Sequence, residues 1–250
     1  MSAPGTLYLL PTGLGSDAPD VLLPAATREI ALGLRHFIAE RPKTARAFLK
    51  QIGYPHPLNE TSVETLDKDT PASALSELLA PLLAGSDAAL LSEAGCPAVA
   101  DPGALLVREA HAAGVRVIPL IGPSAILLAL MASGLNGQRF MFHGYLPVAA
   151  PARAAQLREL EKRSRLDDAT QIFIETPYRN DSMLQALLEH CAPQTLLCVA
   201  VDLTLPSEQI LTRPIEAWRG QALALDRRPA VFLLYSGGRR ALSEASGRSS

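Results

Sequence analysis

Four short segments rich in glycine, alanine, serine and proline each follow an apolar run of strand length, and this arrangement suits ligand binding through the backbone. They are PTGLGSDAP from residue 11, SEAGCPAVADPG from residue 92, GPSA from residue 122 and ETPYR from residue 175. Small side chains let N–H and C=O groups approach a ligand, and proline fixes a loop before the ligand arrives. One such loop could be a simple connection, whereas four together favour a binding site.

A few polar side chains near these loops could act on a bound molecule. Lys43 and Arg46 are spaced to share one face of a helix and could meet a phosphate. His143 and Tyr178 could orient a substrate or relay a proton, although a histidine beside aromatic residues is more often structural. Lys43 and His143 are therefore the candidate catalytic residues. Asp101, in Asp-Pro-Gly, fits a turn or helix-cap role better than catalysis.

One predicted helix carries a local group of cations that could contact nucleic acid phosphates. The alternative is a solvated surface helix in which glutamates pair with the cations at short range. The cations are Arg153, Arg158, Lys162, Arg163 and Arg165, and the glutamates are Glu159 and Glu161.

The elements that must position these residues alternate between apolar runs of strand length and amphipathic stretches, which is typical of a parallel sheet covered by helices. Helices are expected near 24–39, 43–52, 71–84, 103–113, 124–133, 151–163 and 178–191, and strands near 7–10, 88–91, 115–120, 139–147, 170–177, 195–204 and 229–237. We therefore predict an α/β protein with an N-terminal domain over 1–121 and a second over 122–237. Residues 238–250 have no apolar period and are expected to be disordered.

Composition limits the class of protein. The chain has 250 residues, 48% of them hydrophobic, which is enough for a substantial core, and its net charge of −2 gives no global attraction to nucleic acid. Three cysteines without C-x-x-C spacing predict no metal site and favour a reducing compartment. The uncharged stretch 117–137 is interrupted by prolines and a glycine, so we expect a strand, a turn and a helix rather than a membrane span. With no evident signal peptide, a cytoplasmic location is expected.

Seven segments, in order over roughly residues 7–236, resemble one known family. They are LLPTGLGS, AERPKTARAFLKQIG, SEAGCPAVADPG, VRVIPLIGPSA, FHGYLP, FIETPYR and AVDLTLPSEQI. Together they resemble the 2′-O-ribose methyltransferases of small-subunit ribosomal RNA, a branch of the tetrapyrrole (corrin and porphyrin) methylase superfamily. The resemblance implies two αβα domains with an S-adenosylmethionine cleft between them, no metal, and a homodimer that acts on ribosomal RNA or the small subunit. The absence of G-x-x-x-x-G-K and of a clean G-x-G-x-x-G agrees with a cofactor that has no phosphates.

The resemblance also implies which residues line the cofactor pocket. The small-residue loops contribute backbone and small side chains, Glu175 lines the pocket from the second domain, and the backbone of Leu203 meets adenine or ribose. For Val99, Ala125 and Leu203 an ordinary core position is the alternative. The full set is Pro11, Glu93, Ala94, Gly95, Val99, Ser124, Ala125, Glu175 and Leu203.

The chain departs from the family at polar positions. The acidic-Thr-Arg run is replaced by Arg41-Pro42-Lys43, the lysine after E-L-T by Leu205, and the terminal R-K-G-E by Arg227-Arg228-Pro229-Ala230. Cofactor binding is thus better supported than the RNA activity. Three functions remain open: ribose methylation of RNA, methylation of a tetrapyrrole or another small molecule, and cofactor binding without catalysis. An aromatic content of 5% offers few platforms for stacked bases.

Overall fold

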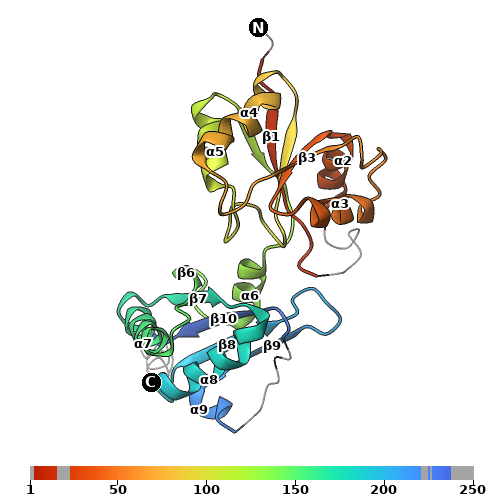
Figure 1. Ribbon diagram of the computed structural model, residues 1–250. Helices are drawn as coiled ribbons and strands as arrows, with labels where there is room; N and C mark the ends of the chain where they lie inside the picture. Colours follow the sequence, from red (N-terminus) through yellow and green to blue (C-terminus); the bar gives the residue numbers. More distant parts are fainter. Residues whose placement is uncertain (1–2, 16–22, 221–224, 226, 238–250) are drawn as a thin grey trace, which may run out of the picture. The chain divides into compact units, whose positions relative to one another are not determined.

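The chain divides into two compact α/β units, unit 1 over Met1–Ser124 and unit 2 over Ala125–Ser250. The structure is a computed structural model that describes residues 3–15, 23–220, 225 and 227–237 (Figure 1). The boundary predicted from the sequence, between residues 121 and 122, lies three residues before the one between Ser124 and Ala125, and the tail predicted over 238–250 lies outside the described residues.

Unit 1 is a parallel sheet in the order β3-β2-β4-β1-β5. Its strands are β1 (Thr6–Leu10), β2 (His36–Ala39), β3 (Ser62–Thr65), β4 (Ala88–Leu91) and β5 (Arg116–Pro119), and its helices are α2 (Ala25–Gly33), α3 (Pro42–Gln51), the 3₁₀ turn η1 (Ala72–Ala74), α4 (Leu75–Leu83) and α5 (Ala104–Ala112).

Both faces of this sheet are buried, and β4 shows why. Ala88 and Leu90 pack in the apolar cluster with α4 and α5, whereas Ala89 and Leu91 pack in the cluster with α2 and α3. Because side chains alternate across a strand, a run of four apolar residues fits only a strand with helices on both sides. Figure 1 shows α4 and α5 apart from α2 and α3.

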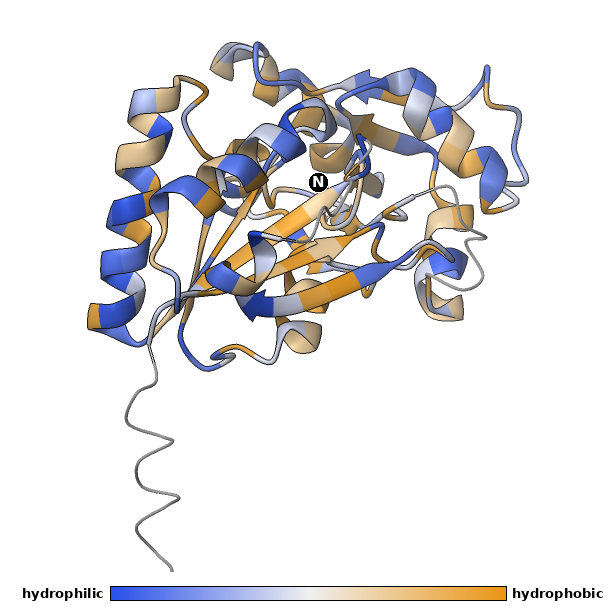
Figure 2. Cartoon of the chain, turned by 90° about the horizontal axis from the view of Figure 1, so that it is seen from below, coloured by the Kyte–Doolittle hydropathy of each residue, from blue (hydrophilic) through white to orange (hydrophobic). Residues whose placement is uncertain are grey.

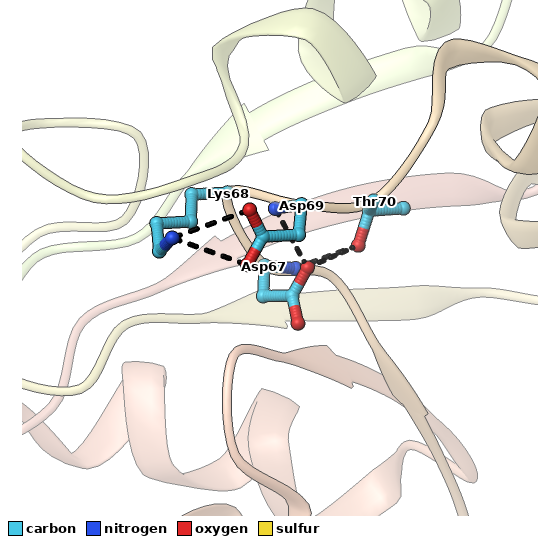
Figure 3. Close-up of polar contacts among 4 residues, drawn as sticks. All are labelled: Asp67, Lys68, Asp69 and Thr70. Carbon is cyan, nitrogen blue, oxygen red and sulfur yellow. Dashed lines mark hydrogen bonds and ion pairs between the residues drawn. The ribbon is translucent and has the colours of Figure 1, made fainter.

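The connection after β3 is an exposed turn fastened by its own side chains (Figure 3). The Thr70 hydroxyl and the Asp69 N–H donate to Asp67 Oδ1 at 2.8 and 3.0 Å, and Lys68 pairs with Asp69 at 3.1 Å. The hydrogen bond from the Thr70 hydroxyl, followed by that from Asp69 N–H, lowers the pKa of the Asp67 carboxyl below its ordinary value. This turn leads the chain into η1 and α4.

Unit 2 is a mixed sheet in the order β6-β7-β10-β8-β9. Its strands are β6 (Phe140–Tyr145), β7 (Thr170–Ile174), β8 (Leu196–Val201), β9 (Gln209–Pro214) and β10 (Ala230–Tyr235), and its helices are α6 (Ala125–Ser133), α7 (Ala150–Asp167), the 3₁₀ turn η2 (Pro177–Arg179), α8 (Asn180–His190) and α9 (Ile215–Trp218). The core includes Phe173 and Phe232, whose rings stack 5.7 Å apart, and Trp218, which donates from Nε1 to the Leu197 carbonyl. The strands are coloured largely hydrophobic in Figure 2, whereas the long helix α7 is mainly hydrophilic.

Three expectations from the sequence are corrected. The helix expected over 24–39 ends at Gly33, and its last residues form β2. The short strand β3 and the partly polar strand β9 were not expected. The second sheet is not parallel, because β10 lies between β7 and β8 and runs antiparallel to both.

The stretch 117–137 contains the end of β5, a loop and α6, as predicted. No helix in the described ranges has the length and apolar character needed to cross a membrane.

Candidate active site

Three loops of unit 1 lie at the carboxyl ends of β1, β4 and β5, where parallel sheets bind their ligands. The first two are tied together by backbone. Thr12 and Gly95 exchange N–H···O=C bonds of 3.0 and 3.3 Å, and the Thr12 hydroxyl donates to the Ser92 carbonyl at 3.2 Å. The Ser92 hydroxyl donates to the Gly95 carbonyl at 3.0 Å.

The third loop packs against the other two at close range. A β-carbon on Gly122 would lie 2.5 Å from Cβ of Pro11, a distance that side chains do not tolerate. Cys96 Sγ lies 3.5 Å from the Pro123 carbonyl, to which it donates. Three loops distant in the sequence therefore form one edge lined by backbone and small side chains.

The loop after β4 needs small residues because of its backbone. Gly95, Ala98, Ala100 and Gly103 have φ of 76°, 63°, 59° and 135°. A β-carbon on Gly103 would also lie 2.6 Å from Leu90 Cδ2. Two alanines in left-handed conformation cost on the order of 1 kcal/mol each, and such strain gathers at functional sites. The left-handed positions and the close contact at Gly103 therefore restrict this loop to small residues and fix its shape.

A hollow of about 370 Å³ opens between α3 and the loops that follow β1 and β4. Glu93 lies in it with Thr44 and Gln51 of α3, while Phe48 forms an apolar wall. Its volume is at the lower end of small-molecule sites, about 300–1,000 Å³. The remaining lining residues are Thr12, Gly13, Gly15, Ala45, Ala47 and Ser92.

The carboxylate of Asp101 lies next to Glu93 of this hollow. The Glu93 N–H donates to Asp101 Oδ2 at 3.2 Å. Burial raises the pKa of the Asp101 carboxyl, the hydrogen bond from Glu93 N–H partly offsets this, and the nearby Glu40 carboxylate raises the pKa further. Asp101 thus holds the loop together as a hydrogen-bond acceptor, in agreement with the turn role expected for it.

In unit 2 the corresponding edge begins at Glu175, directly after β7. Its side chain is fully buried, and one oxygen, Oε1, accepts both the Thr176 N–H and the Arg179 guanidinium at 2.6 Å. The other oxygen, Oε2, is buried and has no hydrogen-bond partner in the described part of the protein. A buried carboxylate oxygen without a donor is rare unless a ligand or water supplies one.

Leu203 follows β8 at the same edge, because β7 and β8 both run antiparallel to β10 and so run parallel to each other. Its side chain is buried, which leaves only its backbone for a ligand. Next to it, Asp202 accepts from Arg228 Nε at 2.8 Å and from the Ser207 hydroxyl at 2.7 Å. Asp202 and Thr204 both have positive φ, and the buried Thr204 hydroxyl has no hydrogen-bond partner among the described residues.

The other predicted site residues lie on different elements. Ala94 and Val99 are exposed on the loop after β4, and Ser124 and Ala125 lie where α6 begins. Lys43 is exposed on α3, next to Thr44 of the hollow. His143 lies within β6, and its Nε2 is 2.7 Å from Oε1 of the buried Gln171.

Several residues at these edges were missed by sequence reasoning. Thr12 and Ser92 each follow a strand, so their position was a usable signal, but Thr44 and Gln51 carry none that distinguishes them from other surface helix residues. Asp202 and Arg228 are paired across 26 positions of sequence, and no short motif predicts such a pair. Among the described residues no group of His, Cys, Asp or Glu is placed to hold a metal ion.

Unit 2 also has a larger hollow, of about 520 Å³, lined by Arg139, Phe140 and Arg163 among others. It lies at the amino ends of β6 and β7, away from Glu175 and Leu203. Ligands of α/β sheets bind at carboxyl ends, so this hollow is not the candidate site.

Comparison with known proteins places the chain among methylases. Residues 6–218 match the family model described as Tetrapyrrole (Corrin/Porphyrin) Methylases. Ribosomal RNA small subunit methyltransferase I of Xylella fastidiosa (strain Temecula1 / ATCC 700964) is 36% identical over 211 residues, which cover 84% of this chain and 73% of the relative. The protein of the same name from Escherichia coli O157:H7 is 32% identical over 258 residues, covering 96% and 80%.

Solved structures agree on the fold. The methyltransferase CobJ superimposes with a TM-score of 0.61 at 19% identity, covering 92% of this chain and 94% of CobJ. Uroporphyrin-III C-methyl transferase of Thermus thermophilus, complexed with S-adenyl homocysteine, gives a TM-score of 0.57 at 18% identity, covering 92% and 97%.

Proposed function

The chain belongs to the tetrapyrrole (corrin/porphyrin) methylase family, and we propose that this S-adenosylmethionine-dependent methyltransferase acts on the ribose of small-subunit ribosomal RNA. The observation that carries the proposal is the 36% identity with a ribosomal RNA small subunit methyltransferase I over most of both chains. CobJ and the uroporphyrin-III enzyme, the two solved structures named above, are only 19% and 18% identical in sequence to this chain. Because they share its fold but are less similar in sequence, methylation of a small molecule is the second candidate function.

The described residues fit the cofactor. In unit 1, Pro11, Glu93, Ala94, Gly95 and Ser124 lie at an edge without bulky side chains, where a ligand could approach the main chain. In unit 2 the unpartnered Oε2 of Glu175 could accept from a ribose hydroxyl or an adenine amine, and the backbone near Leu203 is at the same edge. Val99 and Ala125 complete the proposed set, with apolar contacts.

When bound, the cofactor supplies an electrophilic methyl group on a sulfonium. The protein has to hold the acceptor oxygen in line with that methyl group and exclude water, and correct alignment accounts for much of the rate. The carboxylate of Glu93, which lies in the hollow beside α3, favours a cationic ligand, and this hollow has room for a single nucleoside. We propose Lys43 and His143 as acceptor-side residues; the hydrogen bond between His143 and Gln171 favours an orienting role for the histidine.

Lys43→Ala should lower kcat about tenfold and change cofactor affinity less than twofold. Lys43 is exposed beside the hollow and would neutralise a phosphate next to the acceptor ribose, so its loss weakens alignment but not the cofactor loops. Lys50→Ala, an exposed lysine two turns along α3, is the control and should keep full activity. An equal loss of cofactor affinity and turnover in the Lys43 variant would contradict the proposal that Lys43 acts on the acceptor.

The function is tested by methyl transfer to small ribosomal subunits from a strain that lacks the gene. Label from S-adenosylmethionine should enter a 2′-O-methylated nucleoside detected by mass spectrometry, and kcat/KM should fall steeply with salt. Arg158 and Lys162 are exposed on α7, and changing both to Glu should reduce kcat/KM at least about tenfold and flatten the salt dependence. Label in a tetrapyrrole instead would support the second candidate, and cofactor binding without any transfer would support a non-catalytic protein.

Homodimer formation and a cytoplasmic location are proposed with this function. Unit 2 exposes apolar side chains on α6 and around β6, and surfaces of this kind are typical of subunit contacts. They include Leu127, Met131, Phe140, Tyr145 and Val148.

A further inference from the structure

Tyr178 and Arg227 form an exposed pair at the edge of unit 2. The Tyr178 residue is 77% exposed, and the Arg227 guanidinium lies 5.2 Å from the centre of its ring. That distance is within the range of a cation–π contact. Such a pair exposes a flat aromatic surface and a cation side by side.

Partly buried hydrogen bonds hold together the two backbone segments that carry the pair. Asn180, fully buried at the start of α8, donates from Nδ2 to the Arg228 carbonyl at 2.7 Å. Asp181 accepts the Leu225 N–H at 3.3 Å, and Arg228 N–H closes a turn onto the Leu225 carbonyl at 2.7 Å. The segment that carries Arg227 is therefore fastened on both sides to the segment that follows Tyr178.

The backbone of Arg227 is strained in this turn. Its φ is 60°, a left-handed conformation that favours glycine. Strain of this kind persists where the surrounding structure imposes it, and it gathers at functional sites. Here the imposed conformation holds a guanidinium over an aromatic ring.

Arg227 also supplies the local positive charge. Its two arginine neighbours are neutralised, Arg179 by Glu175 at 2.6 Å and Arg228 by Asp202 at 2.8 Å. The described residues offer no carboxylate to Arg227 within ion-pair distance. A polyanion with flat bases is complementary to an exposed ring beside an exposed cation.

We propose that Tyr178 and Arg227 form a stacking platform for an unpaired base of the RNA next to the acceptor nucleotide. Proteins that bind single-stranded RNA stack bases on tyrosine rings and on guanidinium planes. Tyr178 lies three residues after Glu175, so the platform adjoins the edge assigned to the cofactor. The inference rests on the proposed function and adds a residue pair that positions the RNA.

The direct test is fluorescence of the Tyr178→Trp variant. Trp218 is 1% exposed and serves as an internal reference that a bound base does not reach. A single-stranded cytidine hexanucleotide should quench the new tryptophan, whereas a hexamer of abasic ribose phosphates should not. Equal quenching by both would show a phosphate contact without stacking and would overturn the platform.

Affinity for small-subunit RNA gives the second readout. Tyr178→Ala should weaken binding at least about fivefold and leave the salt dependence unchanged, because no charge is removed. Tyr178→Phe keeps the ring and should bind as the parent does, and S-adenosylhomocysteine affinity should stay the same in both. Equal loss of RNA and cofactor affinity in Tyr178→Ala would assign the ring to the cofactor instead.

Failure of the platform and failure of the proposed function are separable. If the parent protein methylates ribosomal RNA, but the cytidine hexanucleotide does not quench Tyr178→Trp and Tyr178→Ala binds RNA as the parent does, only the platform is rejected. If the parent neither binds nor methylates RNA, the proposed function fails and the platform fails with it.

Discussion

Gly95→Val is expected to lower the affinity for S-adenosylhomocysteine at least about 100-fold, equivalent to about 2.7 kcal/mol. Gly95 has a φ of 76°, and a β-carbon there would lie 3.2 Å from Leu14 Cδ2 and 3.5 Å from the Pro123 carbonyl. Gly95 also exchanges two backbone hydrogen bonds with Thr12. A branched side chain would push apart the loops whose backbone is proposed to hold the cofactor.

Gly114→Val is the matched control for this substitution. Gly114 has a φ of 72°, so the backbone penalty is similar, but no atom lies within 4 Å of a β-carbon built there. Calorimetry should show parent-like binding in the control, and thermal unfolding should shift similarly in both variants. Parent-like binding in Gly95→Val would contradict the proposed cofactor site in unit 1.

Much of the first sheet could be predicted from the sequence because its strands are apolar and bounded by proline or glycine. β2 was missed for a physical reason: Phe37, Ile38 and Ala39 are all buried in a central parallel strand, so they show no alternation. A run of three apolar residues after a helix then continues the helical pattern. β3 and β9 are edge strands, where polar residues are tolerated and the pattern is weak.

The strand order and strand directions of the mixed sheet in unit 2 could not be predicted from the sequence pattern. β10 is the last strand in the chain yet lies between β7 and β8, and nothing in AVFLLY specifies its direction or its neighbours. Strand order depends on contacts between distant residues, such as the stacked rings of Phe173 and Phe232. Local periodicity does not record those contacts.

The sequence indicated which loops form the candidate site, but it did not indicate the hydrogen bonds between distant residues there. The small residues of 92–103 pointed to close backbone approach, and the structure explains them through four positive φ values and the bonds to Thr12. The hydrogen bond between Asp202 and Arg228, by contrast, joins residues that come close only when β8 and β10 pair.

Glu175→Gln is expected to lower S-adenosylhomocysteine affinity at least about 30-fold, equivalent to about 2 kcal/mol. The buried Oε2 of Glu175 has no donor in the described part of the protein, so a ligand donor would satisfy it. An amide NH₂ at that position presents hydrogens to a donor and also removes the negative charge. The variant should be less stable as well, because it leaves Arg179 without its partner.

Glu161→Gln separates the loss of stability from the loss of binding. Glu161 is also a buried carboxylate of unit 2, and it accepts from Ala192 N–H and the Thr195 hydroxyl, away from the carboxyl ends of β7 and β8. The Glu161→Gln variant should unfold at a lower temperature and bind S-adenosylhomocysteine as the parent does.

Gly95 belongs to unit 1 and Glu175 to unit 2. Loss of affinity in both Gly95→Val and Glu175→Gln would therefore mean that binding of one ligand depends on both units. Loss in Gly95→Val alone would place the cofactor on unit 1 and leave the unpartnered oxygen of Glu175 to another donor.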